Sequence, residues 1–141
     1  MYSTSIKDSK YSLICLAVLD EVCIVDFIVD TGAMLTCCNY TSLKSNLCET
    51  DFAGSEIKLL GGFVKSSPVK FYKCELKQFT IGNIDMGGQV IWITFDERVT
   101  DTVLGMDILQ QMIFTANPYD KKIYFCKDAN DYNNNFKLKI V

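Results

Sequence analysis

The stretch FIVDTGAML (residues 27–35) carries an apolar run directly into an aspartate, a threonine and a glycine. An isolated ionised carboxylate is costly to remove from water, so an aspartate at the end of a core strand usually has a partner, several hydrogen bonds or a chemical role. Asp30 is therefore the first candidate functional residue. The alternative interpretation is that Asp30 is a turn residue that only ends a strand.

The segments around Asp30 predict a chain built from β-strands. β-branched apolar runs at 11–19 and 22–30 are separated by two acidic residues, which predicts a hairpin. A second hairpin is predicted around GGFVKSS (61–67), where the glycines favour a mobile tip. Shorter strands are predicted from the apolar runs at 34–40, 79–82, 83–86 and 89–95, and within 112–126 on either side of a turn at 118–120.

The C-terminal third changes its pattern twice. In VLGMDILQQM (103–112), apolar residues recur at helical spacing after a glycine, which predicts one short helix. NDYNNN (130–135) is predicted to be a polar linker. FKLKIV (136–141) alternates apolar residues with lysines, as an amphipathic strand does. The whole pattern predicts an all-β chain with one late helix.

Length and composition exclude several classes of protein. The 141 residues suffice for one domain with a sizeable core, and 49% hydrophobic with 22% charged residues is typical of a globular protein. The net charge of -3 and the scattered lysines argue against nucleic-acid binding, which needs clustered positive charge. No apolar stretch approaches the roughly 20 residues that span a bilayer, and no signal peptide is visible at the start. A cytoplasmic protein without a membrane partner is expected.

The counts of cysteine and histidine restrict the available chemistry. Seven cysteines occur without any C-x-x-C spacing, so neither a metal site nor a cofactor is expected, and the thiols are interpreted as packing residues. The chain has no histidine, which excludes Ser-His-Asp and Cys-His catalysis. Chemistry must therefore use carboxylates, hydroxyls, lysines or thiols. A thiol or metal protein stays open as an alternative.

Three sequence elements together resemble the retropepsin-type aspartic proteases of retroviruses and retrotransposons and the similar bacterial proteins. The elements are Asp30-Thr31-Gly32-Ala33 after an apolar strand, the glycine-bearing LLGGFVK (59–65), which is close to the flap tip of the viral enzymes, and Val103-Leu104-Gly105 before a helix. The tripeptide alone is a weak signal, but three elements in the right order are a far stronger one. The resemblance covers about residues 11–126.

The resemblance implies a single-domain, all-β retropepsin-like acid protease fold with one short helix on the C-terminal side, active as a homodimer. It divides the chain into an N-terminal segment (1–10), the protease domain (11–126), and a polar linker with a C-terminal strand (127–141). Because family members use terminal strands at the dimer interface, the last strand is expected to pair with the other subunit.

The implied activity is that of an aspartic endopeptidase, a hydrolase that cleaves an extended polypeptide with water. Two carboxylates that share one proton can take a proton from the water and give one to the amide. At about 4 Å and an effective dielectric of 20, two unit charges repel by about 4 kcal/mol, so one of the pair stays protonated. The chain has a single D-T-G, since DTV at 101–103 lacks the glycine, so the second Asp30 must come from a second copy on a two-fold axis.

The resemblance also assigns roles to the neighbouring residues. Thr31 is expected to hydrogen-bond across the dimer axis, and Gly32 to allow a close approach of the backbone to the carboxylates. The expected substrate-binding residues are Ala33 and, in a flap that closes over an extended peptide, Gly61, Gly62, Phe63 and Val64. Val103, Leu104 and Gly105 are expected to pack over the active-site loop and support it.

Other interpretations of the same residues stay open. The chain could be a non-catalytic dimeric module with the retropepsin fold that grips extended peptides without cutting them. Gly61 and Gly62 could form an ordinary hairpin turn. Asp107 is predicted to be an N-terminal helix residue, favoured there by the helix dipole, rather than a second catalytic acid.

Overall fold

The computed structural model describes residues 1–7, 10–18, 22–43, 47–117, 119 and 121–136. Within these ranges the chain is built mainly of β-strands, which confirms the all-β prediction. The strands are β1 (Tyr2–Lys7), β2 (Lys10–Val18), β3 (Val22–Val29), β4 (Cys37–Asn39), β5 (Ile57–Val64), β6 (Ser67–Leu76), β7 (Gln78–Ile81), β8 (Ile84–Asp85), β9 (Gln89–Thr94), β10 (Val103–Leu104), β11 (Ile113–Asn117) and β12 (Lys122–Cys126). The helices are two 3₁₀ turns (Tyr40–Leu43 and Glu49–Phe52), α1 (Met106–Leu109) and α2 (Ala129–Phe136).

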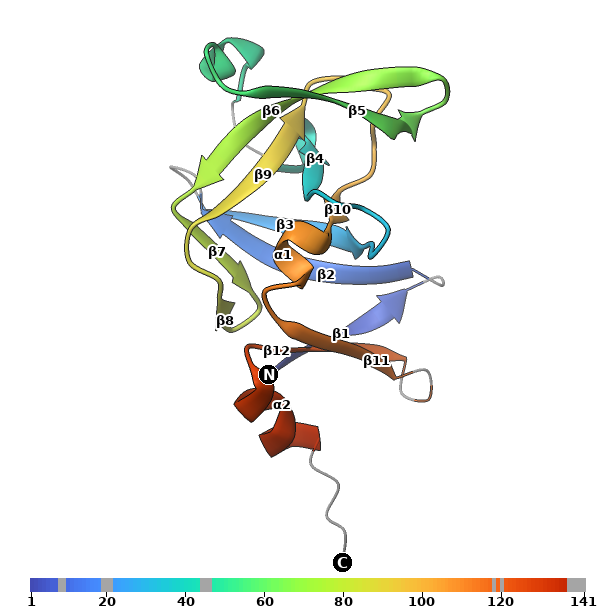
Figure 1. The fold of residues 1–141 in the computed structure, drawn as a ribbon, viewed down its shortest axis with the longest axis vertical. Coiled ribbons are helices and arrows are strands. Elements are labelled where there is room, and N and C mark those ends of the chain that lie inside the picture. The colour runs from blue at the N-terminus through green and yellow to red at the C-terminus, as the bar shows by residue number, and fades with distance from the viewer. Residues whose placement is uncertain (8–9, 19–21, 44–46, 118, 120, 137–141) are drawn as a thin grey trace, which may run out of the picture.

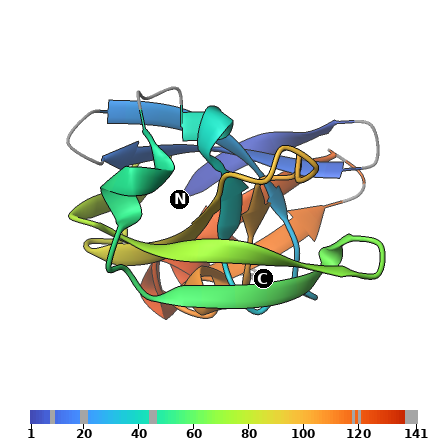
Figure 2. The ribbon, with the colours of Figure 1, turned by 90° about the horizontal axis from the view of Figure 1, so that it is seen from above.

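The strands pair in the order β11-β12-β1-β2-β3-β10-β4-β9-β6-β5, and β7 and β8 branch from β2. The β5–β6 hairpin lies at one end of the molecule, and β1, β11, β12 and α2 lie at the other (Figure 1). Seen from above, this hairpin runs across the width of the molecule (Figure 2). Neither α1 nor α2, nor any other helix in the described residues, is long and apolar enough to cross a membrane.

The pairing of β3 with β10 brings together segments that are distant in sequence. β2 and β3 form the predicted antiparallel hairpin. β10 then runs parallel to β3, with Val103 opposite Ile28 and Leu104 opposite Val29. Because the two strands run in the same direction and stay in register, the residues that follow them, Asp30 and Gly105, emerge at the same end.

The β5–β6 hairpin has an irregular turn region. The predicted tip segment 61–67 contains the turn of the hairpin. The turn is formed by Lys65 and Ser66, and Ser66 has a φ of 61°. It is not formed by the two glycines on which the prediction was based. Gly61 and Gly62 lie within β5, where the register shifts between Leu60 and Val64. A φ of 90° at Gly62 explains why a glycine is used at this shift.

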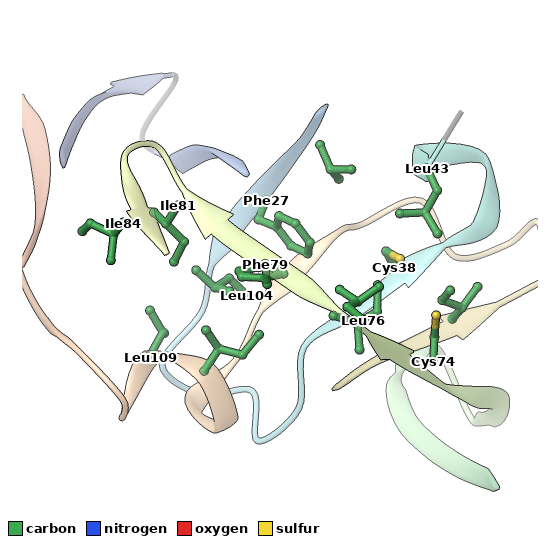
Figure 3. Close-up of a cluster of buried hydrophobic side chains, with 14 of the residues drawn as sticks. Phe27, Cys38, Leu43, Cys74, Leu76, Phe79, Ile81, Ile84, Leu104 and Leu109 are labelled. Atoms are coloured by element: carbon green, nitrogen blue, oxygen red, sulfur yellow. The ribbon is translucent and has the colours of Figure 1, made fainter. Parts of the chain in front are cut away.

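The main core lies between the β2–β3 hairpin, β7 and α1. Phe27 and Phe79 pack edge to face with ring centroids 6.1 Å apart, and Leu104 and Leu109 lie beside them (Figure 3). All four side chains are fully or almost fully buried, and burial of such a side chain contributes about 1.5–3 kcal/mol. Leu104 therefore anchors β10 in the core. A second cluster, under the β5–β6 hairpin, is formed by Cys37, Val69, Phe71, Trp92 and Val99.

Both terminal segments of the chain contain secondary structure that was not predicted from the sequence. β1, inside the predicted N-terminal segment 1–10, pairs with β12 and so belongs to the sheet. The predicted linker at 130–135 is wrong, because α2 occupies it. The Asp128 carboxylate accepts a hydrogen bond from the backbone N–H of Asp131 at 2.9 Å, and the ring of Phe136 packs on Tyr124. Phe136 ends α2, and the rest of the predicted strand, 137–141, lies outside the described residues.

Candidate active site

The loop after β3 holds the Asp30 carboxylate in a defined orientation. The backbone N–H of Asp30 donates to the carbonyl of Leu104 at 3.1 Å, which ties the start of the loop to β10. The Asp30 Oδ1 accepts a hydrogen bond from the Gly32 N–H at 2.8 Å, and the Ala33 N–H donates to the Asp30 carbonyl at 3.2 Å. A Cβ at position 32 would lie only 3.2 Å from the same Oδ1, so glycine leaves this approach unobstructed. The carboxylate itself is exposed in the single chain.

The first residues of α1 bind the other side of this loop. The N–H of Met106 donates to the Ala33 carbonyl at 2.8 Å, and the N–H of Asp107 donates to the Met34 carbonyl at 3.2 Å. These N–H groups have no partner inside the helix, so the loop satisfies them. A Cβ on Gly105 would meet the Leu35 carbonyl oxygen at 2.5 Å. Glycine is therefore required for the loop and the helix to approach this closely.

A cleft of about 390 Å³ opens at the Asp30 loop. It is lined by the β3–β4 loop, by the irregular part of β5, and by the residues at the start of β10. The lining residues are Asp30, Gly32, Ala33, Met34, Leu35, Cys37, Leu60, Gly61, Gly62, Phe63, Asp101 and Val103. The arrangement places an oriented carboxylate at an otherwise largely apolar surface, as in a ligand site.

No family model matches the sequence, and no curated protein matches it either. Among solved structures, a retropepsin-like aspartic protease from Rickettsia conorii matches with a TM-score of 0.63 and 16% sequence identity, over 87% of this chain and 97% of that one. The chain has a retropepsin-like fold. The EIAV protease in complex with the inhibitor HBY-793 matches with a TM-score of 0.51 and 16% identity, over 76% of this chain and 91% of that one. The resemblance found in the sequence is thereby confirmed for the fold.

The retropepsin-like fold brings most of the expected site residues to one cleft. Its lining includes Asp30, Gly32, Ala33, Gly61, Gly62, Phe63 and Val103. The remaining expected residues do not line it. Thr31 is exposed beside Asp30, Val64 is half-buried in the cluster under the hairpin, and Leu104 and Gly105 are buried behind the loop. Leu104 and Gly105 thus contact the loop from the core side, where support is expected.

Within the retropepsin-like fold, Thr36 joins the loop to α1, a role that no sequence pattern predicted. Thr36 is fully buried, its Oγ1 accepts a hydrogen bond from the Gly105 N–H at 3.0 Å, and it donates to Asp107 Oδ1 at 2.7 Å. The Thr36 N–H also donates to Asp107 Oδ2 at 3.1 Å. Asp107 lies in the first turn of α1, as predicted, and its carboxylate serves as this acceptor.

Replacing Thr36 with valine is expected to lower the free energy of unfolding by about 2 kcal/mol. Valine has nearly the same shape, but it leaves the buried Gly105 N–H without its acceptor and removes a donor from Asp107. Urea denaturation at matched protein concentration measures the loss. Thr36→Ser is the control, because it keeps the hydroxyl and loses only a methyl group. A valine variant as stable as the serine variant would contradict the proposed link.

One thiol, Cys37, lies in the lining of the cleft and bears on the thiol alternative. Its Sγ donates to the Leu35 carbonyl at 3.5 Å. Burial, with a smaller contribution from the charge of Asp107, raises the pKa of the Cys37 thiol to about 12. The thiol is therefore protonated at neutral pH and is a weak nucleophile. In the part of the chain that the structure describes, no three cysteine, aspartate or glutamate side chains gather where they could hold a metal ion.

Proposed function

We propose that the chain is an aspartic endopeptidase that cleaves extended polypeptides as a homodimer, with one Asp30 from each subunit. The observation that carries the proposal is the Asp30 carboxylate, oriented by the Gly32 N–H at 2.8 Å and facing a cleft that is also lined by β5. The fold shared with retropepsin-like proteases supports this assignment. The enzyme is proposed to need no cofactor and to work in the cytoplasm.

The reaction needs two carboxyl groups that share one proton. The ionised carboxylate takes a proton from water as the water oxygen bonds to the peptide carbonyl carbon. The protonated partner gives its proton to the substrate, and the carbon–nitrogen bond then breaks with the amine as the leaving group. After product release the pair again shares one proton. Two aspartates can fill both roles, because two carboxyl groups close enough to share a proton do not both ionise.

The second carboxyl group is proposed to come from a second copy of the chain. The other carboxylate in the described lining of the cleft, Asp101, makes no hydrogen bond to Asp30 or to any other described residue, so the pair does not share a proton within the single chain. Thr31 is exposed next to Asp30, and its hydroxyl makes no hydrogen bond within the described residues. An exposed carboxylate and hydroxyl side by side are suited to contact their own symmetry mates.

The substrate is proposed to bind as an extended strand. Among the described strands, β5 pairs with β6 alone, so its other edge has backbone groups available for a peptide. Leu60, Gly61, Gly62 and Phe63 of β5 line the cleft above Asp30. The register shift and the positive φ of Gly62 make this segment the natural place for movement on peptide binding.

The test is peptide cleavage measured over a range of enzyme concentrations. Cleavage should be inhibited by pepstatin, and specific activity should fall steeply below the dimer dissociation constant, because a single chain has half of the catalytic pair. Constant specific activity where sedimentation shows only monomer would rule out the shared pair. A dimer that binds peptides but leaves them intact would instead be the non-catalytic binding module.

A further inference from the structure

Asp101 is a second carboxylate in the lining of the cleft, in the loop two residues before β10. The other described lining residues, apart from Asp30, are glycines or apolar side chains such as Leu35, Phe63 and Val103. No lysine or arginine is among the described residues that line the cleft, so the carboxylates are not neutralised there. The cleft therefore combines apolar walls with uncompensated negative charge.

Asp101 differs from Asp96 and Asp107 because no contact with another described residue uses its carboxylate. Asp96 forms an ion pair with Arg98 at 2.7 Å, and Asp107 accepts hydrogen bonds from Thr36. Asp101 is exposed and makes no hydrogen bond or ion pair with any described residue. Its carboxylate is available to a ligand.

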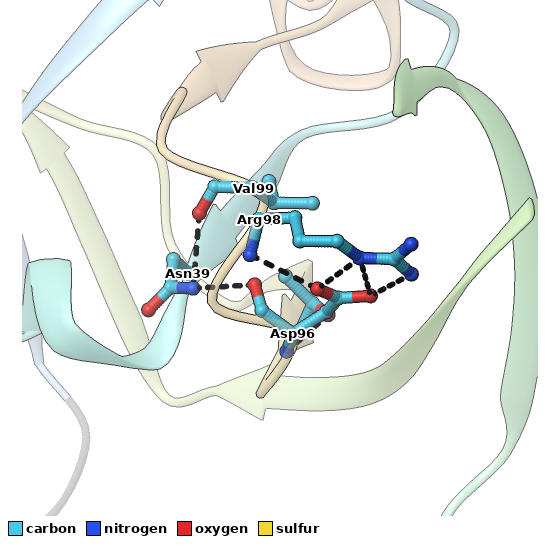
Figure 4. Close-up of polar contacts among 5 residues, drawn as sticks. Asn39, Asp96, Arg98 and Val99 are labelled. Atoms are coloured by element: carbon cyan, nitrogen blue, oxygen red, sulfur yellow. Dashed lines mark hydrogen bonds and ion pairs between the residues drawn. The ribbon is translucent and has the colours of Figure 1, made fainter. Parts of the chain in front are cut away.

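The loop before Asp101 is held in place from the inside. The buried side chain of Asn39 donates from Nδ2 to the carbonyls of Asp96 and Val99, both at 3.0 Å (Figure 4). The N–H of Val99 also donates to the Asp96 carbonyl at 3.1 Å, and Arg98 binds the Asp96 carboxylate with two nitrogens. The hydrogen bonds and charge of Arg98 lower the pKa of Asp96 to about 2, so the ion pair between the two residues persists at ordinary pH.

The residue after Asp101 is anchored as well. Thr102 is buried, its carbonyl accepts a hydrogen bond from the Ile28 N–H at 2.7 Å, and its Oγ1 lies 2.9 Å from Ser42 Oγ. Val103 then enters β10. The backbone on both sides of Asp101 is thus held by hydrogen bonds, which limits the entropy that this segment loses when a ligand binds.

We propose that Asp101 is a specificity-determining residue that selects a lysine or arginine side chain of the substrate next to the cleaved bond. The proposal rests on the endopeptidase function proposed above. A cleft of about 390 Å³ is near the lower end of the size of ligand pockets, so a side chain that enters it lies close to Asp30. The apolar walls suit the methylene stem of a basic side chain, and Asp101 suits its charged end.

A homodimer would place one Asp101 on each side of the catalytic pair. The preference for a basic side chain should therefore extend to both residues that flank the cleaved bond. A purely apolar cleft would instead favour an uncharged side chain of the same length. Lysine and norleucine differ mainly in the charged group, so a pair of otherwise identical peptides isolates the contribution of Asp101.

The experiment identifies cleaved bonds in a peptide library and then compares matched peptides with lysine, norleucine or glutamate beside the bond. We expect kcat/KM to be about tenfold higher for lysine than for norleucine, equivalent to about 1.4 kcal/mol. Asp101→Asn should remove this preference, and Asp101→Lys should shift it toward glutamate. Glu97→Gln, the same change of charge at an exposed residue outside the cleft lining, should retain it. Peptide affinities of the Asp30→Asn variant, measured by fluorescence anisotropy, give a readout independent of cleavage.

The outcomes separate this inference from the proposed function. Cleavage without a basic preference, or a preference that survives in Asp101→Asn, would overturn the role of Asp101 and leave the endopeptidase intact. Lysine-selective binding that depends on Asp101, without any cleavage, would support that role and defeat the endopeptidase. If the chain neither binds nor cleaves any peptide, both proposals are wrong.

Discussion

Replacing Asp30 with asparagine is expected to abolish peptide cleavage while leaving the chain folded. An amide can neither accept the proton of the attacking water nor share a proton with its symmetry mate, so one substitution disables both halves of the pair. We expect a loss of about 10⁴-fold, the upper end of the contribution of a positioned acid–base group. The fold should survive because the asparagine oxygen can still accept the hydrogen bond from the Gly32 N–H.

Cleavage and thermal unfolding are measured on the same preparations at matched concentration. The control is Asp26→Asn, the same substitution at an exposed position of β3 that lies outside the cleft lining; it should keep full activity. A structural Asp30 predicts the reverse result, with a lowered melting temperature and largely unchanged activity. Cleavage that persists in a clean Asp30→Asn preparation would defeat the endopeptidase proposal.

Replacing Gly105 with alanine is expected to give the largest loss of stability, about 3 kcal/mol, with a displaced Asp30 loop and reduced activity. The new methyl group would lie 2.5 Å from the Leu35 carbonyl oxygen and 3.0 Å from that of Ala33. Both contacts are with backbone atoms, which cannot move aside as a flexible side chain can. The hydrogen bonds from the backbone N–H groups of α1 to the carbonyls of Ala33 and Met34 would have to lengthen.

Urea denaturation of the Gly105 variant needs a control with the same chemical change. Gly88→Ala serves, because a Cβ there would meet its nearest backbone atom, the Leu76 carbonyl oxygen, at an ordinary 3.5 Å. Its stability should change by no more than about 0.5 kcal/mol, as expected for a surface substitution. Equal stability of the two variants would show that the loop and α1 are not in the close contact described.

Much of the fold could be predicted because its signals are local. The pairing of β2 with β3 follows from two β-branched runs separated by two acidic residues, and each strand carries its own pattern. The proximity of the Asp30 loop to Gly105 could also be predicted, but only from the resemblance to the retropepsin-type proteases. Nothing in the spacing of the residues between them requires β10 to pair with β3.

The features that could not be predicted depend on contacts distant in sequence or on weak local preferences. Thr36 and Asp107 are 71 residues apart, and a threonine beside an apolar strand looks like an ordinary β residue. The α2 helix lies in a segment rich in asparagine, which has modest helix propensity. Its cap at Asp128 is local, but the ring contact of Phe136 with Tyr124 of β12 is a tertiary feature. In the sequence, Asp101 stands out only as the start of DTV (101–103), which lacks the glycine of D-T-G, and nothing there places it in the cleft.

The parallel pairing of β3 with β10 also sets the order in which the molecule can mature. Val103 lies opposite Ile28, a separation of 75 positions (103 minus 28). The pairing therefore closes a long chain loop, and because this closure costs conformational entropy we expect it to form late in folding. A nascent chain that ends before Val103 can form the β2–β3 hairpin but has no Leu104 carbonyl to hold the Asp30 backbone. At about 5–20 residues per second, synthesis of the intervening segment takes several seconds. The Asp30 loop therefore stays unassembled on the ribosome until most of the domain has been made.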